Sequence, residues 1–522
     1  MYYTQTELIK RKILMDKINI DTSRLTDLIK SDIQKKEKMI EGVKYYKCIH
    51  DILNHVHYYY VEFEKTIDIQ KANNKVPHPF HRKLVKQKTK YICSKPINFT
   101  TPEVEIEDPE NPTKEELAAI EQAQDYQTKL KDLLGDRFNK LMMTWITGAS
   151  NKSYEVVHPY ITPKNELKYI IVPAEECALI YDTQYQDQLK AVVRYYTYEF
   201  IAENGNKKNL YKVEYWTDKD VTYWEQIEDG SFITDTFYDV NPAGHFHTFN
   251  TSRPKEVKQH SWGKVPFIVL KNNDEMMTDL EPIKGLIDSY DKVKSGWIND
   301  IEDFQELIYV VKGYRGLSSK AQEGLSELAI FMQNVKTHKV IAVDSEGDVT
   351  TLKAEIPVDA KERFLKLTEK EIYKFADGVD MSQDVFGNNP SGVSIEFLYD
   401  DLHGKANETI LYAKVALSEL FWFLTKYINM KYYKNYNSTG MVFTFNLSRP
   451  TNQLETVQLL NQSDLSKQTY YENHPLIHDS EEEMKRKERE ETEAREKGYI
   501  DLAEVDDDGR ELPGEEEDSN SE

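Results

Sequence analysis

Two long helical patterns dominate the distribution of apolar residues along this chain. The first runs from about Asp279 to Ile308, and the second from about Ser391 to Met430. In both patterns apolar residues recur at steps of three and four, which places them on one face of a helix. A helix of the second length would span roughly 60 Å, whereas the mean globular helix has only about 11–12 residues. Elements of this length are typical of proteins that bridge a distance.

A compact insertion and a loop separate the two patterns. Lys339–Val343 and Val349–Ala354 have strand-like composition and flank the turn-forming run Asp344–Asp348, which predicts a hairpin. A further helix is predicted at about Asp359–Ala376. The next run, Gly378–Gly392, holds three glycines, two asparagines and a proline, so regular helix is not expected there.

The N-terminal half combines helices with a β-rich subdomain. Helical patterns cover Asp21–Tyr46 and a basic stretch, Phe80–Lys95, that begins after Pro79. Thr113 and Glu116 have the spacing of a capping box, which predicts a helix start that continues to about Thr147. Residues 154–270 alternate short β-rich runs with turn residues. The chain is therefore predicted to be α+β and mainly helical.

The C-terminal part is predicted to return to the β-rich subdomain and then end in helices. Val442–Leu447 has the pattern of a single strand. Three shorter helices are predicted at 453–461, 467–472 and 481–498, the last capped by Ser480. Residues 501–522 carry 11 acidic residues and one Arg, and are predicted to be a disordered tail.

Charge and composition narrow the class of protein. The 522 residues carry a formal net charge of −23, which argues against tight binding of nucleic-acid phosphates through clustered Lys and Arg. An acidic protein can nevertheless surround DNA without sticking to it. The three cysteines are widely spaced and predict neither a disulfide framework nor a metal site. No apolar run is long enough to suggest a membrane span or a signal peptide.

Motifs for common catalytic chemistry are absent from the sequence. It contains no GxxxxGK[ST], GxGxxG, HExxH, GxSxG or CxxC. His245 and His247 could share a strand face, but no acidic or Cys partner lies nearby in the sequence, so an ordinary structural role is favoured. His78 and His81 also have ligand-like spacing, which the helix start at Pro79 explains better. We therefore expect no catalytic residue, no cofactor and no metal.

One basic row has two interpretations that the sequence leaves open. Arg363, Lys366, Lys370 and Lys374 recur at three to four residues and share a helix face. They could contact passing phosphates, or they could pair with nearby glutamates or with a neighbouring subunit.

Several segments in a fixed order resemble the phage portal protein family, as found in siphophages of Gram-positive bacteria. The resemblance covers about residues 40–500. It is carried by 74–88 with Lys95-Pro96, by 263–267 with Asn272-Asn273, by 280–291 running on to 312–314, and by 391–393 with Phe397-Leu398 and Lys405-Ala406.

The resemblance implies a portal-type architecture for the whole chain. It assigns 1–278 to a wing that includes the β-rich 154–270, 279–306 to a stem helix, 307–357 to a clip, 358–377 to a second stem helix, 378–390 to a tunnel loop, 391–430 to a long kinked helix, 431–450 to a wing strand, 451–500 to a helical crown and 501–522 to the tail.

The resemblance also implies a function, sites and partners. The protein is expected to form a ring, of 12 subunits by analogy, at the capsid vertex of the virion, through which double-stranded DNA is packaged and ejected. The expected partners are the terminase large subunit, a head-completion or adaptor protein, and capsid and scaffold proteins, with synthesis in the host cytoplasm and no membrane. The tunnel loop would contact DNA through Gln383, Asn388, Asn389 and Ser391.

Two competing hypotheses belong to other classes. One is a metal-dependent hydrolase that uses the β-rich subdomain around His245 and His247. The other is a different head-assembly protein, such as a scaffold or an adaptor. A ring with a central hole would distinguish the portal from both.

Overall fold

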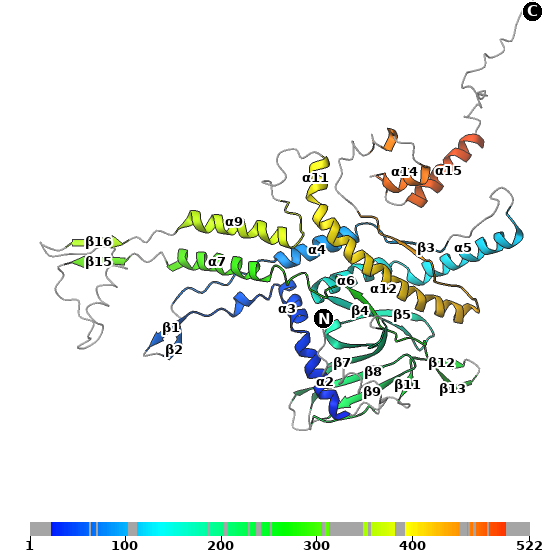
Figure 1. Ribbon diagram of the computed structural model, residues 1–522, viewed down its shortest axis with the longest axis horizontal. Coiled ribbons are helices and arrows are strands. Elements are labelled where there is room, and N and C mark those ends of the chain that lie inside the picture. The colour runs from blue at the N-terminus through cyan, green and yellow to red at the C-terminus, as the bar shows by residue number, and fades with distance from the viewer. Residues whose placement is uncertain are drawn as a thin grey trace, which may run out of the picture. The chain divides into compact units, whose positions relative to one another are not determined.

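The computed structural model describes residues 22–61, 64–68, 71–102, 112–185, 188–201, 207–227, 230–235, 242–250, 253–303, 308–312, 348–352, 357–381, 392–447, 457, 460–462, 466–474, 476–477 and 480–496. The chain divides into two units. The first comprises residues up to 380 together with 400–447, and the second comprises 381–399 together with 448–522. Both contain helix, and the sheets lie in the first (Figure 1), which confirms the α+β class.

The first unit begins with a series of helices. They are α2 (Thr22–Lys35), α3 (Glu37–Tyr46), the 3-10 turn η1 (Asp51–Asn54), α4 (Phe80–Ile92), α5 (Lys114–Leu134) and α6 (Arg137–Lys152). The helix predicted over Asp21–Tyr46 is interrupted at Lys36, whose buried ammonium group donates to the Cys177 carbonyl at 2.9 Å. The small hairpin β1 (Tyr58–Val61) and β2 (Glu64–Ile67) precedes α4.

The capping box at the start of α5 is confirmed. The backbone N–H of Glu116 donates to the Thr113 hydroxyl, and the Thr113 N–H donates back to the Glu116 carboxylate. The single helix predicted to reach Thr147 is wrong, because the chain turns at Gly135. Its φ of 53° is in the left-handed region, where a side chain is strained but glycine is not.

The β-rich region predicted at 154–270 is confirmed. It contains β4 (Tyr154–Ile161), β5 (Leu167–Val172), β6 (Cys177–Tyr181), β7 (Leu189–Ile201), β8 (Lys207–Trp216), β9 (Asp220–Gln226), β10 (Phe232–Thr234), β11 (Ala243–Gly244), β12 (Phe246–Asn250), β13 (Arg253–His260) and β14 (Ile268–Lys271), with the turn η2 (Ala174–Glu176). The main sheet has the order β10-β9-β8-β7-β6, and a second sheet has the order β14-β4-β5.

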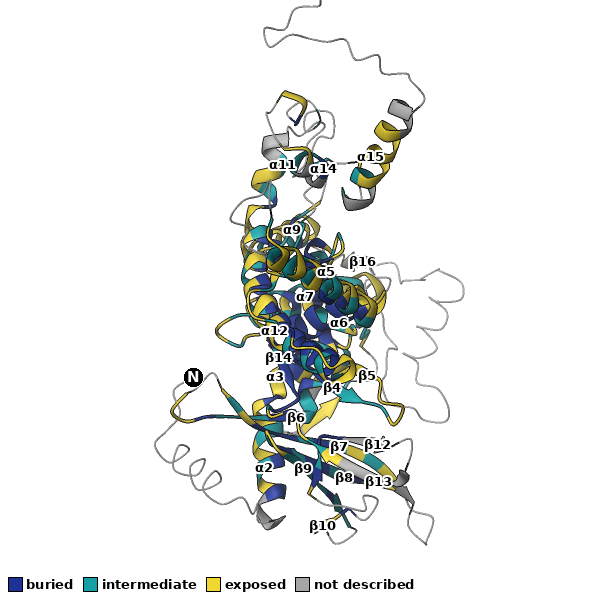
Figure 2. Cartoon of the chain, turned by 90° about the vertical axis from the view of Figure 1, so that its right-hand side faces the viewer, coloured by how far each residue is buried: buried dark blue, intermediate teal, exposed yellow. Residues whose placement is uncertain are grey.

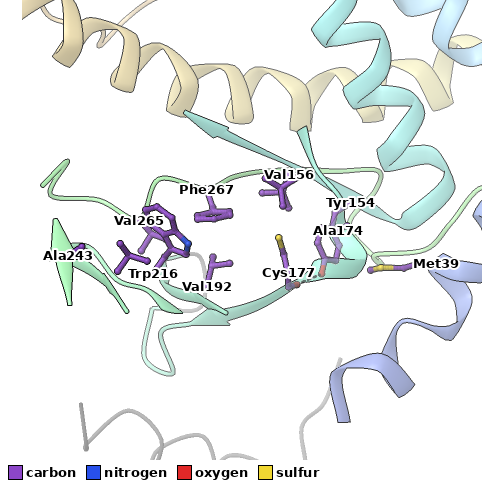
Figure 3. Packing of buried hydrophobic residues seen from close by; sticks show 12 residues of the cluster. Met39, Tyr154, Val156, Ala174, Cys177, Val192, Trp216, Ala243, Val265 and Phe267 are labelled. Atoms are coloured by element: carbon purple, nitrogen blue, oxygen red, sulfur yellow. Dashed lines mark hydrogen bonds between the residues drawn. The ribbon is translucent and has the colours of Figure 1, made fainter. Parts of the chain in front are cut away.

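Both faces of the main sheet are covered, because adjacent residues on a strand point to opposite sides. Val192 of β7 lies in a cluster with Val156, Trp216 and Phe267, which fills the space between the two sheets (Figure 3). Its neighbour Val193 lies in a different cluster, against Leu25 and Ile29 of α2 among other residues. The main sheet therefore has two buried faces.

The remaining elements of the first unit follow the β-rich region. They are α7 (Lys284–Asp303), β15 (Ile308–Lys312), β16 (Asp348–Leu352), α9 (Val358–Phe375), α12 (Asp400–Tyr432) and β17 (Val442–Thr444). One side of α12 is buried, and residues on its opposite side are exposed (Figure 2). β17 pairs with β3 (Asn98–Thr100), so the prediction that this strand joins the 154–270 subdomain is wrong.

Two of the long-helix predictions need correction. Ile308, counted as the last residue of the first helical stripe, begins strand β15, and α7 ends at Asp303. The second helix is not continuous, because α11 (Gly392–Leu398) and α12 are separated at Tyr399. Gly404, a candidate for a kink, lies inside α12, five residues after this break.

The second unit contains α11, α14 (Lys467–Asn473) and α15 (Ser480–Glu496). The helices predicted at 467–472 and 481–498 are confirmed to within a few residues, although Ser480 is itself the first residue of α15. The predicted helix at 453–461 and the predicted tail at 501–522 lie largely or wholly outside the described residues.

Candidate functional site: the α7–α9 helix pair

Helices α7 and α9 lie side by side and are joined at their far ends by paired strands (Figure 1). The strand β15 follows α7 and pairs antiparallel with β16, which precedes α9. The predicted hairpin placed Val349–Ala354 against Lys339–Val343, a segment that lies outside the described residues. The described partner of this strand is instead Ile308–Lys312.

An apolar seam joins α7, α9 and the N-terminal helices. Ile283 and Ile287 are fully buried, as is Ile372 of α9, and they share one cluster with Leu280 and Ala376. Tyr45 of α3, with Phe80 and Leu84 of α4, completes the same cluster. Burying each such side chain contributes roughly 1.5–3 kcal/mol, so this seam is a substantial part of what holds the pair in place.

The four basic residues predicted on the second stem helix share the exposed face of α9. Arg363, Lys366, Lys370 and Lys374 are all exposed, whereas Leu365, Thr368 and Ile372 on the opposite face are buried. Lys366 pairs with Glu362 at 2.9 Å and lowers the pKa of that carboxyl through its hydrogen bond. Pairing within the subunit therefore accounts for Lys366, one of the four basic residues.

The four residues predicted in the tunnel loop are Gln383, Asn388, Asn389 and Ser391. All four lie outside the described residues, and the description resumes at Gly392.

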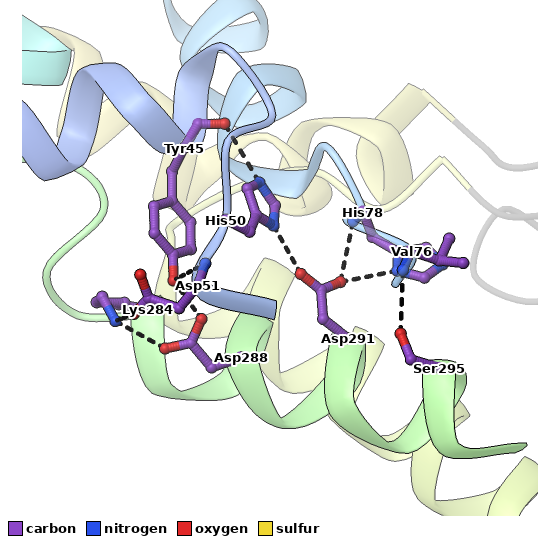
Figure 4. A network of polar contacts seen from close by, with 9 residues as sticks. All are labelled: Tyr45, His50, Asp51, Val76, His78, Lys284, Asp288, Asp291 and Ser295. Carbon is purple, nitrogen blue, oxygen red and sulfur yellow. Dashed lines mark hydrogen bonds and ion pairs between the residues drawn. The ribbon is translucent and has the colours of Figure 1, made fainter. Parts of the chain in front are cut away.

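A buried carboxylate fixes α7 to the segment that precedes α4 (Figure 4). Asp291 accepts from the His50 ring at 2.6 Å, from the His78 ring at 2.8 Å and from the His78 N–H at 2.9 Å. Burial raises the pKa of Asp291, but these hydrogen bonds outweigh it and hold the pKa below its ordinary value. One turn along α7, the Ser295 hydroxyl accepts from the Val76 N–H at 3.1 Å.

A second polar group lies at the start of α7. Lys284 bridges Asp51 at 2.7 Å and Asp288 at 2.8 Å, and the Tyr45 hydroxyl also donates to Asp288 (Figure 4). Burial alone lowers the pKa of Lys284, but the two carboxylates outweigh it and raise the pKa. Both polar groups tie α7 to the chain between α3 and α4. Contacts within a single subunit are therefore enough to hold α7 in place.

The third polar group is a charge cluster buried beneath α4 and α12. Asp279 pairs with Lys88 of α4 at 2.7 Å and with Lys405 of α12 at 3.5 Å, and the Asn272 amide donates to it at 3.1 Å. Burial raises the pKa of Asp279, but the two ammonium groups lower it by more. Burial lowers the pKa of Lys88 to about 8. The geometry favours the ionised forms of Asp279 and Lys88, because each side chain has charged or hydrogen-bonding partners.

Sequence reasoning missed most residues of this framework. Lys88 belongs to the basic stretch Phe80–Lys95, for which no buried position was predicted, and it is only 2% exposed. A buried position was detectable in principle, because Lys88 shares a helix face with Leu84, Tyr91 and Ile92, which are also buried. Its partner Asp279 lies too far along the chain for any local signal.

Three of the histidines considered as metal ligands make other contacts. His78 binds Asp291, and the His81 ring lies 2.9 Å from the Asn151 side chain. His245 is buried and accepts from the Trp262 N–H at 3.2 Å, and burial lowers its pKa. Among the described residues, no group of three or more His, Cys, Asp or Glu side chains could hold a metal ion.

Comparison with known proteins decides the family. A family model described as phage portal protein, SPP1 Gp6-like, matches residues 25–497. The chain belongs to this family. The portal protein of Bacillus phage SPP1 is 33% identical over 477 residues, covering 90% of this chain and 86% of that relative. The portal protein of Clostridium phage phiCD119 is 26% identical over 483 residues, covering 89% of this chain and 95% of that relative.

Two solved neck structures are also similar to this chain. A structure titled "Neck of native GTA particle computed with C12 symmetry" covers 75% of this chain and 88% of its own, with a TM-score of 0.37 and 10% identity. A second, "Neck of empty GTA particle computed with C6 symmetry", has a TM-score of 0.39 and 11% identity, covering 75% and 89%.

Membership of the family gives the chain its function. It is a portal protein, a structural component of the virion at the capsid vertex, where portal subunits assemble into a homo-oligomeric ring, and it is not an enzyme. The hydrolase hypothesis is therefore wrong, and so is the scaffold or adaptor hypothesis. No described helix has the length and apolar character that crossing a membrane requires.

Proposed function

We propose that α7 and α9 of each subunit form the stem of a ring of 12 subunits and that double-stranded DNA moves through its centre. The observation that carries this proposal is the arrangement of α9, which is buried on one face against α7 and presents Arg363, Lys366, Lys370 and Lys374 on its exposed face. A helix held in this way can face a channel with one side while its other side is fixed.

The other segments take the roles implied by the family. Residues 1–278 and 431–450 form the wing, 307–357 the clip, 378–390 the tunnel loop and 451–500 the crown. The pairing of β15 with β16 supports the clip assignment, because it returns the chain to α9 at the point where α7 ends. The placement of 448–522 in a different unit from most of the wing supports a separate crown, although 381–399 belong to that unit as well.

The proposed contact with DNA does not depend on base sequence. Lysine and arginine side chains on α9 would meet phosphates, and amide side chains such as Asn388 and Asn389 would meet the backbone. The net charge of −23 limits the total attraction, so the duplex can slide. The clip would dock the terminase large subunit during packaging and a head-completion or adaptor protein afterwards, and the wing would meet capsid and scaffold proteins.

Electron microscopy and packaging assays together test this proposal. Purified protein should give rings with twelve-fold symmetry and a central hole wide enough for a duplex, which is about 20 Å across. A phage lacking its portal gene should package DNA when this protein is supplied. Rings of another symmetry would contradict the subunit number. Rings in which α9 lies on the outer surface would contradict the stem assignment.

A further inference from the structure

The C-terminal end of α12 exposes large apolar and aromatic side chains next to lysines. We call residues 430–434 the α12 corner. Its exposed large side chains are Met430 at 39%, Tyr432 at 45% and Tyr433 at 96%. Lys431 and Lys434 are exposed in the same short stretch. The α12 corner therefore presents apolar surface and positive charge together.

Tyr433 occupies a backbone position that normally belongs to glycine. Helix α12 ends at Tyr432, and Tyr433 follows with a φ of 54°, in the left-handed region. The Lys434 N–H donates to the Asn429 carbonyl at 3.2 Å, which is the closing hydrogen bond of a Schellman motif. A bulky side chain is strained at this position. Because the ring is almost wholly exposed, burial within the subunit does not offset that strain, and a contact outside the subunit would.

The charge of the α12 corner is opposite to that of the chain. Asp and Glu make up 90 of the 522 residues, yet residues 420–454 contain neither. Asp125 of the adjacent helix α5 is already bound by Lys129 and by the Tyr436 hydroxyl. Lysines near a helix C-terminus also favour the helix dipole, but that does not account for the exposed rings. A basic and aromatic surface on an acidic protein is complementary to an acidic partner.

The α12 corner lies far from the proposed channel. Near its start α12 is attached to the end of α9, where Lys405 donates to the Ala376 carbonyl at 2.8 Å. From Lys405 to Tyr432 the helix extends roughly 40 Å at about 1.5 Å per residue. It runs away from α9 (Figure 1). A surface at this distance from the proposed stem suits a protein around the ring better than DNA inside it.

We propose that the α12 corner docks an acidic segment of the capsid protein that surrounds the ring, with the Tyr433 ring as its anchor. This inference rests on the proposed function, because it takes α9 to line the channel and the wing to meet the capsid. Tyrosine is enriched in the buried centres of protein interfaces, where it contributes both a ring and a hydroxyl. Single-stranded nucleic acid also stacks on exposed rings, but the net charge of −23 disfavours a polyanion.

Binding of assembled rings to the purified capsid protein of the same phage tests the proposal. Tyr433→Gly removes the ring and relieves the strain of the left-handed position, so its thermal unfolding midpoint should equal or exceed the parent's. Its rings should nevertheless bind capsid protein about tenfold more weakly, as expected when an aromatic anchor is lost. Replacing Lys431 and Lys434 together by Glu should also weaken binding, and the parent's binding should weaken as salt is raised.

Two control variants keep the test specific. Tyr185→Ala removes another exposed ring, from the loop after β6, and Lys414→Glu reverses an exposed charge earlier on α12. Both should bind capsid protein as the parent does. Parent-like binding of Tyr433→Gly, or an equal loss in the controls, would overturn the proposal. A lower unfolding midpoint of Tyr433→Gly would also overturn it, because the ring would then have a structural role.

The remaining outcomes separate this proposal from the proposed function. If Tyr433→Gly forms no rings, the α12 corner is a contact between copies of the chain, and the capsid assignment is wrong. If Tyr433→Gly keeps capsid binding and loses binding to a single-stranded oligonucleotide, the partner is nucleic acid, and the capsid assignment is again wrong. If parent rings package DNA but bind no capsid protein, the channel stands and the docking surface is refuted. If Tyr433→Gly loses capsid binding while α9 proves to lie outside the channel, the docking surface stands and the stem assignment is wrong.

Discussion

The His50 ring donates to the Asp291 carboxylate across 2.6 Å, and neither side chain is exposed to solvent. The second ring nitrogen of His50 lies 3.3 Å from the Tyr45 carbonyl, so both of its nitrogens face acceptors. The segment before α4 is therefore attached to α7 by a buried hydrogen bond to a carboxylate.

Asp291→Asn should destabilise the protein by about 3 kcal/mol at neutral pH, because it removes the negative charge that three hydrogen bonds converge on. The folded-state pKa of Asp291 is lowered, so its stabilising contribution is present above the unfolded pKa of about 3.9 and is lost as the pH falls through the folded value. The variant should therefore lose less stability on acidification. Urea unfolding between pH 3 and 7, followed by tryptophan fluorescence, would measure both effects.

Asp300→Asn is the matched control for this experiment. Asp300 is on the same helix and pairs with Lys361, but its side chain is 50% exposed. Since exposed pairs contribute about 0–1 kcal/mol, its replacement should change the unfolding free energy little. Equal effects of the two substitutions would contradict the importance of burial at Asp291.

Asp279→Asn should be among the most destabilising single changes in the first unit, at about 3–5 kcal/mol. It leaves the ammonium groups of Lys88 and Lys405 close together with no carboxylate between them. Adding Lys88→Met should recover part of the loss, because the unpaired buried charge is then gone. A double-mutant cycle measured by denaturant unfolding tests this coupling. Strictly additive effects would show that the pair is not coupled.

Two glycine-to-alanine changes should have opposite signs. At Gly42 an added Cβ would lie 2.1 Å from the Asn151 backbone oxygen, so α3 and α6 would have to separate, at roughly 1–3 kcal/mol. At Gly404, inside α12, nothing lies within 4 Å of the added atom. Gly404→Ala should therefore stabilise the helix by about 0.5–1 kcal/mol. Thermal unfolding of both variants is the measurement, and a loss of stability at Gly404 would show that its flexibility is needed.

Replacing Arg363, Lys366, Lys370 and Lys374 together by Gln should leave ring assembly unchanged, because all four side chains are exposed. If these residues meet phosphates, the variant's packaging rate should depend less on salt concentration than the parent's. Packaging measured from low to moderate salt distinguishes the two interpretations of the row. An identical salt dependence would assign the row to pairing with glutamates of the same subunit or with a neighbouring subunit.

The sequence predicted elements well where local signals were strong. The helix at Asp359–Ala376 matches α9 to within a residue, because its apolar stripe is regular and Pro357 marks its start. The Thr113 capping box and the β-rich 154–270 were found for similar reasons. The break at Tyr399 was not predicted, although Asp400 and Asp401 occupy the first turn of α12, where acidic residues are favoured.

Errors arose where pairing over long distances decides the structure. Ile308 continued a helical step by coincidence, but it opens the run Ile-Tyr-Val-Val, which favours a strand once β16 is available. The partner of β17 is β3, several hundred residues earlier, so its sheet could not be assigned from neighbouring residues. The polar framework around Asp279 and Asp291 was missed for the same reason.

The pairing of Lys312 with Asp348 has a consequence for how such a protein can diversify. The chain departs from and returns to the α7–α9 pair at adjacent backbone positions, so the stretch between these two residues can be exchanged for one of another length without moving either helix. If the clip docks other proteins as proposed, recombination between related phages would exchange the docking surface and keep α7 and α9 unchanged. Chimeras joined at these two positions should inherit their docking preference from the donor of the exchanged stretch.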